Sequence, residues 1–357
     1  MAQLMLIINP ISGTGSKKGI ADQVVAAMAA CGHEVDVRLT GARGDATRLA
    51  REAADNSYHG VLACGGDGTV NETARGLCGT ATALGILPAG SGNGLARHLQ
   101  IPIDIDLALK VIASDNIVDS DYGTVNDRPF FCTFGLGFDA AVSHRFARQN
   151  HRGLFSYVRS AFTEFLQFRP QTYTISANGK LLTEKAFLVA VCNASQWGNN
   201  AYIAPEANIT DGLLDITLVH SGTAIDAAVM GMDIFTGYIN KNTMVHTFRA
   251  PAVVIYRNKA GEAHIDGEQL PNCRLFFFHL LRRNFFRVQD VDHLRQQNAA
   301  ENCIQIFLLT AFGRFGQDGH FQAIGCVFQL IGSTLFAVKG HGIRRIRNLF
   351  NFRVCKY

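Results

Sequence analysis

A repeating order of short apolar runs, glycine-rich loops and amphipathic segments over residues 1–115 most constrains what this chain can fold into. Strand-like runs, most of them continuously apolar, occupy residues 4–8, 34–39, 61–64 and 84–87. Continuous apolar runs of this length are typical of strands that are buried on both faces. Helical segments are expected between and after them, at residues 20–30, 45–54, 70–77, 94–99 and 105–113. This order predicts an α/β domain with a parallel, Rossmann-like sheet covered by helices on both faces.

The β-rich runs that follow from about residue 126 predict a second domain of a different class. They lie at residues 129–134, 172–177, 186–192, 214–219, 245–248, 252–256 and 264–265, bounded by Gly, Asn, Asp or Pro. One helical section, at about residues 139–168, interrupts them. Many short strands with turn signals are typical of an antiparallel, all-β sandwich. We therefore expect an α/β domain over residues 1–125, a β-rich domain over 126–274 and a tail without a recognised pattern over 275–357.

The tail differs from the rest of the chain in charge and in aromatic content. The net charge of the chain is +4, and residues 275–357 carry eleven Lys and Arg against four Asp and Glu, a net of +7, which leaves −3 for residues 1–274. The tail also holds 13 of the 25 phenylalanines. Residues 321–338 are uncharged over the length of a membrane span, but their glutamines and glycines favour a peripheral, basic and aromatic membrane contact. A divergent extension is the alternative.

Composition excludes several other classes of protein. Apolar residues make up 48% of the chain, which excludes intrinsic disorder, and the mildly acidic main body gives no sign of nucleic-acid binding. None of the nine cysteines forms a C-x-x-C pair, so a zinc ribbon, a thioredoxin motif and a disulfide framework are not expected. Because the first residues lack a basic segment before the apolar run, we expect a cytoplasmic protein.

Three loops carry the chemistry, and each follows one of the predicted parallel strands. They are Asn9-Pro10-Ile11-Ser12-Gly13, Gly65-Gly66-Asp67-Gly68-Thr69 and Pro88-Ala89-Gly90-Ser91-Gly92-Asn93. None is a Walker A loop or a G-x-G-x-x-G fingerprint. Any one of them can be an ordinary tight turn, but three at the same edge of a sheet favour a ligand site. Glycine amides and a helix N-terminus suit a phosphate there.

In this order the loops resemble the soluble diacylglycerol kinase catalytic domain, a family shared with sphingosine kinases. The resemblance covers about residues 1–272 and includes three further segments, at residues 135–139, 204–215 and 266–268. The GGDGT segment alone also occurs in NAD kinases and phosphofructokinases, whereas the ordered set is specific. The resemblance implies an ATP- and Mg²⁺-dependent lipid kinase with its active site in the cleft between the two domains. The membrane lipid that it phosphorylates would carry a primary hydroxyl.

The resemblance also assigns roles to individual residues. Glu268 is the expected proton acceptor, with Asp67 as the alternative and Asp266 beside them in the cleft. Asp121 matches an acidic position of the Mg²⁺ network, and Asp211 and Asp215 match a separate structural cation site. The nucleotide would be bound by Asn9, Ser12, Gly13, Thr40, Gly65, Gly66, Asp67, Gly68, Thr69, Gly90, Ser91, Gly92 and Asn93.

Physical chemistry supports this assignment and leaves alternatives open. A cluster of Asp67, Asp121, Asp266 and Glu268 could coordinate Mg²⁺ and leave one carboxylate to accept the proton of the lipid hydroxyl. Structural turns would equally explain Asp121, Asp211, Asp215 and the Asp266-Gly267 pair. His264 is expected to be structural. Trp197 either lines an acyl channel or, as we favour, packs in the sandwich core.

Two departures from the family pattern bear on the substrate. Glycerolipid kinases commonly carry an acidic residue where Gly94 follows Asn93 here, which tilts the expectation towards a sphingoid base. The resemblance also ends soon after Glu268. Diacylglycerol, a sphingoid base, ceramide and phosphatidylglycerol all remain candidate lipids. An NAD kinase-like enzyme and a non-catalytic lipid-binding protein of the same fold are the alternative functions, and no sequence feature indicates an oligomeric state.

Overall fold

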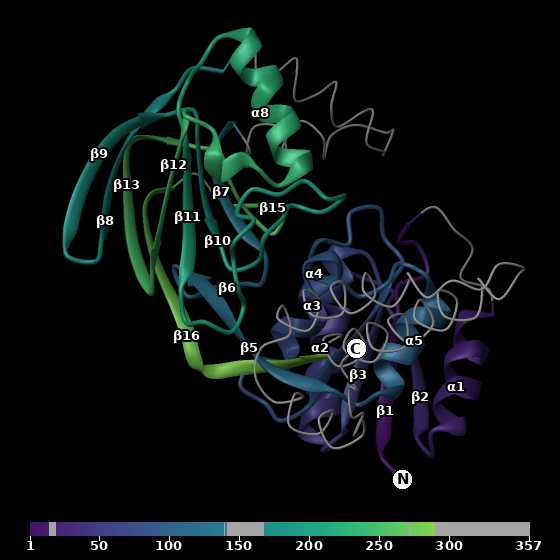
Figure 1. The fold of residues 1–357 in the computed structure, drawn as a ribbon. Coiled ribbons are helices and arrows are strands. Elements are labelled where there is room, and N and C mark those ends of the chain that lie inside the picture. Colours follow the sequence, from purple (N-terminus) through teal and green to yellow (C-terminus); the bar gives the residue numbers. More distant parts are fainter. Residues whose placement is uncertain (14–18, 139, 141–167, 271–272, 290–357) are drawn as a thin grey trace, which may run out of the picture. The chain divides into compact units, whose positions relative to one another are not determined.

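The computed structural model describes residues 1–13, 19–138, 140, 168–270 and 273–289 (Figure 1). Apart from residues 140 and 168, the helical section expected at 139–168 lies outside the described residues. The tail beyond residue 289, with the uncharged stretch at 321–338, also lies outside them. Within the described residues, no helix is both long and apolar enough to cross a membrane.

The first domain has the predicted parallel sheet. Its strands pair in the order β2-β1-β3-β4, all parallel. They are β1 (Gln3–Ile8), β2 (Glu34–Leu39), β3 (Gly60–Gly65) and β4 (Ala83–Pro88). β3 and β4 are buried along their whole length, as their continuous apolar runs predict. The predicted strands are therefore confirmed, with ends that differ by one residue at most.

Helices cover both faces of this sheet (Figure 1). They are α1 (Ile20–Ala30), α2 (Asp45–Asp55), α3 (Asp67–Leu77), α4 (Gly94–His98) and α5 (Ile105–Ala113). α2 contacts α3, and α1 contacts α5, where Gln23 Nε2 donates to Asp106 Oδ1 at 2.5 Å. β1 lies between β2 and β3, so the chain reverses its direction across the sheet beside the end of β1. Ligands of open α/β sheets bind at such a position.

The second domain is a sandwich of two antiparallel layers, as predicted, but it also contains the strand Ile117–Val125, which was expected in the first domain and pairs here with strands of the sandwich. One layer is a six-stranded sheet, in the order β12 (Val245–Ala250), β11 (Leu214–Val219), β10 (Leu188–Cys192), β7 (Thr133–Gly137), β14 (Ala263–Ile265) and β15 (Glu268–Gln269). The other layer consists of β5 (Ile117–Val125), β6 (Arg128–Phe130), β8 (Gln171–Ala177), β9 (Lys180–Ala186), β13 (Ala252–Gly261) and β16 (Cys273–Gln289). Helix α8 (Ala224–Thr236) and the short 3-10 helix η1 (Ile239–Lys241) connect β11 to β12.

Aromatic side chains fill the space between the two layers. Phe134 of β7 lies 4.8 Å from Phe278 and 5.2 Å from Phe276 of β16, measured between ring centroids. Phe130 packs edge-on against Phe278. All four rings are buried, and aromatic pairs at these distances stabilise a core beyond the area that they bury.

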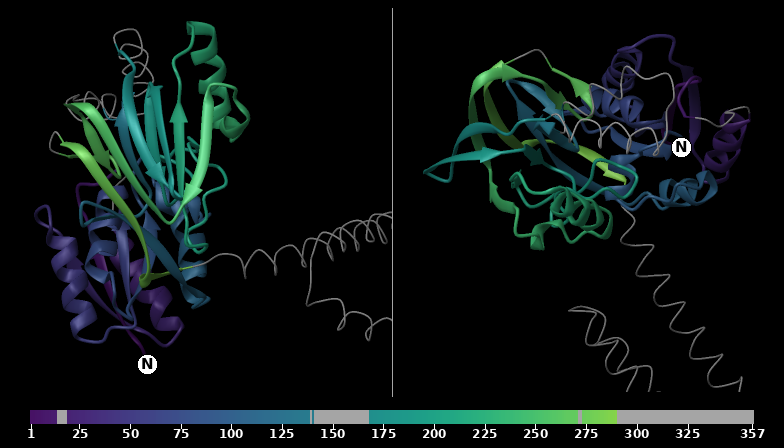
Figure 2. Two further views of the ribbon diagram at one scale, coloured as in Figure 1. Left: turned by 90° about the vertical axis from the view of Figure 1, so that its left-hand side faces the viewer. Right: turned by 90° about the horizontal axis from the view of Figure 1, so that it is seen from above.

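Strand β16 corrects the expected boundary of the tail at residue 275. Its first part pairs antiparallel with β13, its second part pairs antiparallel with β5, and Arg287 and Val288 pair parallel with Ala83 and Leu84 of β4. Residues 275–289 therefore belong to the fold, and they join both domains into one ten-stranded sheet (Figure 2). The sequence did not indicate this, because the strand is interrupted by the polar segment Arg282-Arg283-Asn284.

A buried arginine fixes the end of strand β13. Arg257 is almost fully buried, and its guanidinium donates to the backbone carbonyl oxygens of Cys273, Glu262 and Gly261. It also lies over the ring of Phe276, 5.2 Å from the centroid. Burial lowers the pKa of Arg257. Between Tyr256 and Gly261 the register of β13 and β16 shifts, and the hydrogen bonds of the Arg257 side chain take the place of the regular backbone hydrogen bonds there.

We expect Arg257→Met to destabilise the protein by about 3 kcal/mol, because three partly buried carbonyl groups lose a charged donor. Urea unfolding at neutral pH measures this change. The matched control is Arg274→Met, which removes an exposed arginine from β16. Equal stabilities of the two variants would contradict the structural role of Arg257.

Candidate functional site

The three predicted loops meet at the carboxyl edge of the parallel sheet. The backbone N–H of Asn9 donates to Cys64 O at 3.1 Å, and Asn9 Nδ2 donates to Thr69 Oγ1 at 3.2 Å. The backbone N–H of Ala89 donates to Gly65 O at 2.8 Å. Strands β1, β3 and β4 thus deliver their loops side by side, as the topology of the sheet requires.

Two of the glycines in these loops are required by close backbone approach. A Cβ atom on Gly90 would collide with Cα of Gly66, so the second and third loops touch through their main chains. Gly13 has a φ of +69°, and a Cβ atom there would collide with the carbonyl oxygen of Ala89. Only glycine fits these two positions without strain.

The GGDGT loop opens directly into a helix. Gly66 is the extended N-cap residue and α3 begins at Asp67, three residues earlier than the sequence predicts. The free amides and the dipole of a helix N-terminus favour a negatively charged group nearby. The segment therefore presents positive potential at the same edge as the other two loops.

Asp67 joins the second loop to the third through backbone hydrogen bonds. Its Oδ2 accepts the N–H of Asn93 at 2.9 Å, and its Oδ1 accepts the N–H of Gly94 at 2.5 Å. Burial raises the pKa of Asp67, and these two amides act in the opposite direction. Since both oxygens accept amide hydrogens, Asp67 caps α4 and holds the candidate nucleotide loops together.

Asp266 makes a comparable set of bonds in the sandwich domain. It has a φ of 48°, and its carboxylate accepts the N–H groups of Phe131, Cys132 and Thr133 at 2.8–2.9 Å. Because their backbone N–H groups are bound to Asp266, residues 131–132 do not pair with a neighbouring strand. The run expected at 129–134 therefore forms two strands, β6 and β7. Burial raises the pKa of Asp266, opposed by the three amides.

Cys132 shows that the two aspartates lie near each other. Burial raises the pKa of the Cys132 thiol, and the negative charges of Asp266 and Asp67 raise it further. Electrostatic effects of this kind fall off with distance, so both carboxylates lie close to the same buried sulfur. Asp67 and Asp266 thus both add negative charge near Cys132, and all four of their carboxylate oxygens accept main-chain amides.

Glu268 is arranged differently from these two residues. Its Oε2 accepts a hydrogen bond from Arg43 Nη2 at 2.6 Å, and its side chain is 30% exposed. Arg43 lies in the loop after β2, three residues beyond Thr40, whose N–H donates to Ile8 O. The Arg43 side chain is 76% exposed. Sequence reasoning missed Arg43, because an isolated arginine in a glycine-containing loop has no pattern of its own.

The expected Mg²⁺ cluster of Asp67, Asp121, Asp266 and Glu268 is not formed. Among the described residues, which include all four, no group of three or more His, Cys, Asp or Glu could hold a metal ion. Asp121 is buried on β5, where its Oδ2 accepts the N–H of Gly212 at 2.8 Å and its own N–H donates to Ile209 O. Asp121 thus anchors the turn at residues 209–212, which is the structural alternative that its position allows.

Arg249 holds the two aspartates assigned to a structural cation. Its Nη2 lies 3.1 Å from Asp211 Oδ2, and its Nε donates to Asp215 Oδ1 at 3.0 Å. Burial raises the pKa of Asp215, and Arg249 opposes this shift. Arg249 therefore places a positive charge beside both carboxylates, while Asp215 Oδ2 is buried and has no hydrogen-bond partner in the described part of the chain, so the structural cation site stays a prediction.

A loop of the sandwich domain contacts the third of the predicted loops, residues 88–93. The N–H of Asn199 donates to Gly92 O at 3.1 Å, and Arg97 Nη1 donates to Asn200 Oδ1 at 3.1 Å. His98 Nδ1 accepts the N–H of Ser195 at 3.1 Å and lies 2.9 Å from Ser195 Oγ. No local pattern indicates this contact, because it forms between residues about a hundred positions apart.

Two further expectations about single residues are met. Trp197 packs against a buried cluster that includes Cys192 and Ile203, as expected for a core residue. His264 is buried in β14 and accepts the N–H of Gly267, which is a structural role.

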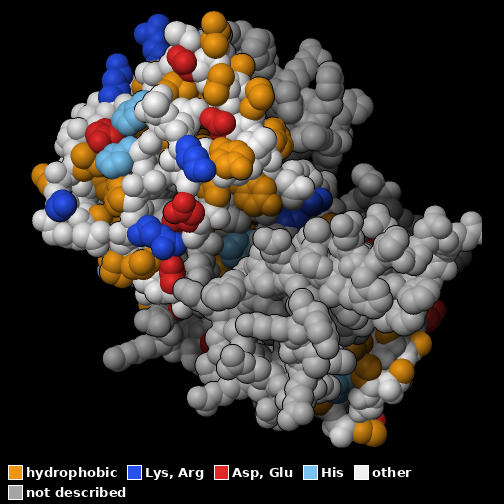
Figure 3. Space-filling view, in the orientation of Figure 1, with side chains coloured by type: hydrophobic (Ala, Val, Ile, Leu, Met, Phe, Trp, Pro, Cys, Tyr) orange, Lys and Arg blue, Asp and Glu red, His pale blue; other side chains and the backbone are white. Residues whose placement is uncertain are grey.

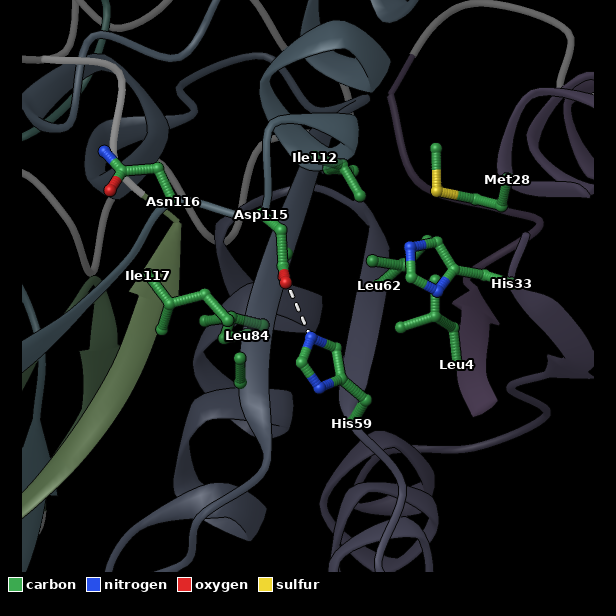
Figure 4. A pocket seen from close by; sticks show the side chains of 13 residues that line it. Leu4, Met28, His33, His59, Leu62, Leu84, Ile112, Asp115, Asn116 and Ile117 are labelled. Carbon is green, nitrogen blue, oxygen red and sulfur yellow. Dashed lines mark hydrogen bonds and ion pairs between the residues drawn. The ribbon is translucent and has the colours of Figure 1, made fainter. Parts of the chain in front are cut away.

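A small pocket elsewhere in the first domain does not belong to the site. It lies at the amino ends of β1, β3 and β4, opposite the three loops, and is lined by apolar side chains such as Leu4 and Leu62 (Figure 4). His59 Nε2 lies 2.8 Å from Asp115 Oδ1 at its mouth. Its volume of about 30 Å³ has room for a single water molecule.

Comparisons with known proteins agree with this architecture. Residues 3–125 match the diacylglycerol kinase catalytic domain family, and residues 133–277 match the YegS C-terminal NAD kinase beta sandwich-like domain family. A "Probable lipid kinase YegS-like" of Chromohalobacter salexigens is 30% identical over 72% of this chain and 85% of its own length. A "Diacylglycerol kinase" of Bacillus subtilis is 27% identical over 75% of this chain and 90% of its own.

Solved structures show the same fold. A diacylglycerol kinase structure from Bacillus anthracis superposes with a TM-score of 0.63, covering 81% of this chain and 96% of that one at 24% identity. The likeness therefore extends over both described domains.

The buried histidine at the docking loop predicts how stability depends on pH. Burial lowers the pKa of His98 from 6.5 to about 4. His98 therefore binds a proton near pH 6.5 in the unfolded chain, but only near pH 4 in the folded protein. The contribution of His98 is complete above pH 6.5 and is lost progressively as the pH falls towards 4, by up to about 3 kcal/mol.

We expect His98→Gln, which keeps a hydrogen-bond acceptor, to flatten the pH dependence of the unfolding free energy between pH 4 and 6.5. Urea unfolding across this range measures the slope. The control is His279→Gln, an exposed histidine on β16. A His98→Gln variant with the slope of the unaltered protein would show that His98 titrates normally.

Proposed function

The chain belongs to the family of lipid kinases with a diacylglycerol kinase catalytic domain, and we propose that it transfers the γ-phosphate of ATP to a primary hydroxyl of a long-chain lipid. One observation carries the proposal. Three glycine-containing loops meet at the carboxyl edge of the parallel sheet, and Glu268 of the second domain reaches the loop that follows β2 at the same edge.

Backbone amides are the groups best placed to bind the ATP phosphates. The start of α3 and the close contact between Gly66 and Gly90 expose main chain without side chains over it. Amide hydrogens in this arrangement stabilise negative charge without a lysine. Asn9 and Thr69, which are hydrogen-bonded to each other, would line the same end of the nucleotide.

Glu268 is the preferred proton acceptor. The carboxylates of Asp67 and Asp266 accept two and three amide hydrogens, and these bonds stabilise the charged form and make each carboxylate a weaker base. Glu268 instead has an exposed arginine as its partner. A general base must come within hydrogen-bond reach of the hydroxyl, and Glu268 can do so by a side-chain movement alone.

Arg43 would assist this step by its charge. The guanidinium lies 2.6 Å from Glu268 and thus beside the position where the γ-phosphate and the lipid hydroxyl would meet. A planar guanidinium binds phosphate oxygens well and stabilises the charge that develops on a transferring phosphoryl group. If the Arg43 guanidinium moved from Glu268 to the phosphate, Glu268 would lose its ion pair and its carboxylate would become a stronger base.

A divalent cation would neutralise charge on the phosphates of ATP. Because the described carboxylates form no metal cluster, we propose that it enters bound to the nucleotide.

The lipid is proposed to be diacylglycerol or a sphingoid base. Diacylglycerol is favoured by the name of the Bacillus subtilis relative. The sphingoid base is favoured by Gly94, where a Cβ atom would lie 3.4 Å from Gly198 N and 3.5 Å from Asp67 Oδ1. The acidic residue that glycerolipid kinases commonly carry at this position would lie close to the Asp67 carboxylate. With Gly94 in its place, the chain has no second carboxylate there that could share a metal ion with Asp67.

The test is transfer of radiolabel from ATP with Mg²⁺ to diacylglycerol, sphinganine, ceramide and phosphatidylglycerol in mixed micelles. NAD serves as a control substrate, since the second domain is similar to the sandwich of NAD kinases. Label in one lipid supports the proposal and identifies the substrate. Label in NAD at a comparable rate would favour the NAD kinase-like alternative.

We expect Glu268→Gln to lower kcat by about 10²- to 10⁴-fold with little change in the dissociation constant of ATP, because the amide cannot accept the proton. Single-turnover kinetics and equilibrium ATP binding measure the two quantities. The matched control, Glu262→Gln, makes the same change of charge six residues upstream. Unchanged turnover of Glu268→Gln would refute this role and favour a non-catalytic lipid-binding protein.

We expect Arg43→Met to lower kcat by about tenfold to a hundredfold, through loss of charge stabilisation in the transition state. The control is Arg48→Met, which removes an exposed arginine from α2. If the two variants have equal kcat values, Arg43 has no part in the reaction.

A further inference from the structure

Helix α8 carries a row of exposed hydrophobic side chains. Ile225 is 76% exposed and Met232 is 69% exposed, and Val229 and Phe235 are exposed by about half. Positions i, i+4, i+7 and i+10 lie on one side of an α-helix. Figure 3 shows hydrophobic side chains gathered over α8 at the top of the view. These four residues are the outer face of α8.

The outer face takes no part in the buried hydrophobic clusters formed by the described residues. The opposite side of α8 packs through Met230 and Ile234 against a buried cluster of the sandwich domain. The helix is also well terminated. Thr223 and Asp226 form a capping box at its start, and Gly237 ends it in the left-handed conformation. A helix anchored on one side and capped at both ends has no structural reason to carry large apolar groups on its other side.

The charges of α8 are kept away from the outer face. Asp226 accepts both the N–H and the hydroxyl hydrogen of Thr223, and these bonds lower the pKa of Asp226. Asp233 accepts from Asn242 Nδ2 at 2.7 Å. Just beyond the helix, Lys241 Nζ lies 4.7 Å from the centre of the exposed Tyr238 ring. An apolar face bordered by a tyrosine and a lysine is typical of helices that lie in a membrane interface.

Helix α8 is linked to the candidate site by a short path of backbone contacts. The N–H of Tyr202 donates to Ile234 O at 2.9 Å, and Tyr202 pairs with Gln196. The loop between them donates from Asn199 N to Gly92 O in the third nucleotide loop. Helix α8 therefore contacts the same segment of the sandwich domain that contacts the loop at residues 88–93.

We propose that the outer face of α8 docks on the surface of a lipid bilayer. The inference rests on the proposed function, because acyl chains keep the substrate of a lipid kinase in the membrane and the enzyme must reach it there. Burial of Ile225, Val229, Met232 and Phe235 among acyl chains drives the docking, and Tyr238 and Lys241 lie at the level of the headgroups. A second copy of the chain is the other occupant that an apolar face of this kind could have.

The test uses the full chain and vesicles of phosphatidylcholine and phosphatidylglycerol in equal parts, with and without long-chain diacylglycerol. Ile225→Gln combined with Met232→Gln removes the two most exposed apolar groups of α8 and leaves the packed side intact. The matched control is Leu181→Gln, which changes a leucine of 73% exposure on β9. We expect the α8 variant to lower the vesicle partition coefficient by at least about tenfold, and the control to leave it unchanged.

Measurements of kinase activity on two forms of the substrate distinguish an effect on membrane docking from an effect on phosphoryl transfer. We expect the α8 variant to phosphorylate vesicular diacylglycerol at least about tenfold more slowly, and water-soluble short-chain diacylglycerol at the unaltered rate. Equal vesicle binding by the variant and the unaltered protein would overturn the proposal. So would a dimer in sedimentation velocity that the variant converts to a monomer without loss of vesicle binding. Vesicle binding that depends on α8, with no lipid phosphorylated, would support docking and refute the proposed kinase activity.

Discussion

Hydrogen bonds from backbone amides to two buried carboxylates hold the candidate site in place. Asp67 accepts two amides and joins the GGDGT loop to the start of α4, while Asp266 accepts three and fixes the residues that precede β7. A buried carboxylate is costly unless it is hydrogen-bonded, and charge-assisted bonds are stronger than neutral ones. Replacing either residue therefore disturbs loop geometry as well as charge, so loss of activity in such variants is not by itself evidence of a catalytic role.

This arrangement divides the acidic residues of the motifs into two kinds. Asp67, Asp121 and Asp266 bind main-chain amides, and Asp211 and Asp215 bind Arg249, so all five stabilise turns. Glu268 alone among the expected catalytic acids has an exposed side chain as its partner. Chemistry at this edge of the sheet then depends on main-chain amides for the phosphates, on Arg43 for charge and on Glu268 for the proton.

Strand β16 explains how two domains of different class support one site. It pairs with β13 and β5 of the sandwich and with β4 of the parallel sheet. Strand β4, which leads to the loop at residues 88–93, therefore belongs to the same sheet as one layer of the sandwich. The loop at residues 195–200 adds a second link, from Ser195 to His98 and from Asn199 to Gly92. Helix α8 contacts this loop through Tyr202, which connects an exposed apolar surface to the same region.

The sequence by itself determined the two fold classes, the parallel strands and the three loops, because continuous apolar runs and glycines act over a few neighbouring residues. Gly13, Gly66 and Gly90 could be predicted as site residues for the same reason. Only the tertiary structure decided which carboxylates are bound by amides, that Arg43 meets Glu268, that Arg249 pairs with Asp211 and Asp215, and that residues 273–289 belong to the fold. Those contacts join residues far apart in the chain, so they depend on distances in space that no local pattern encodes.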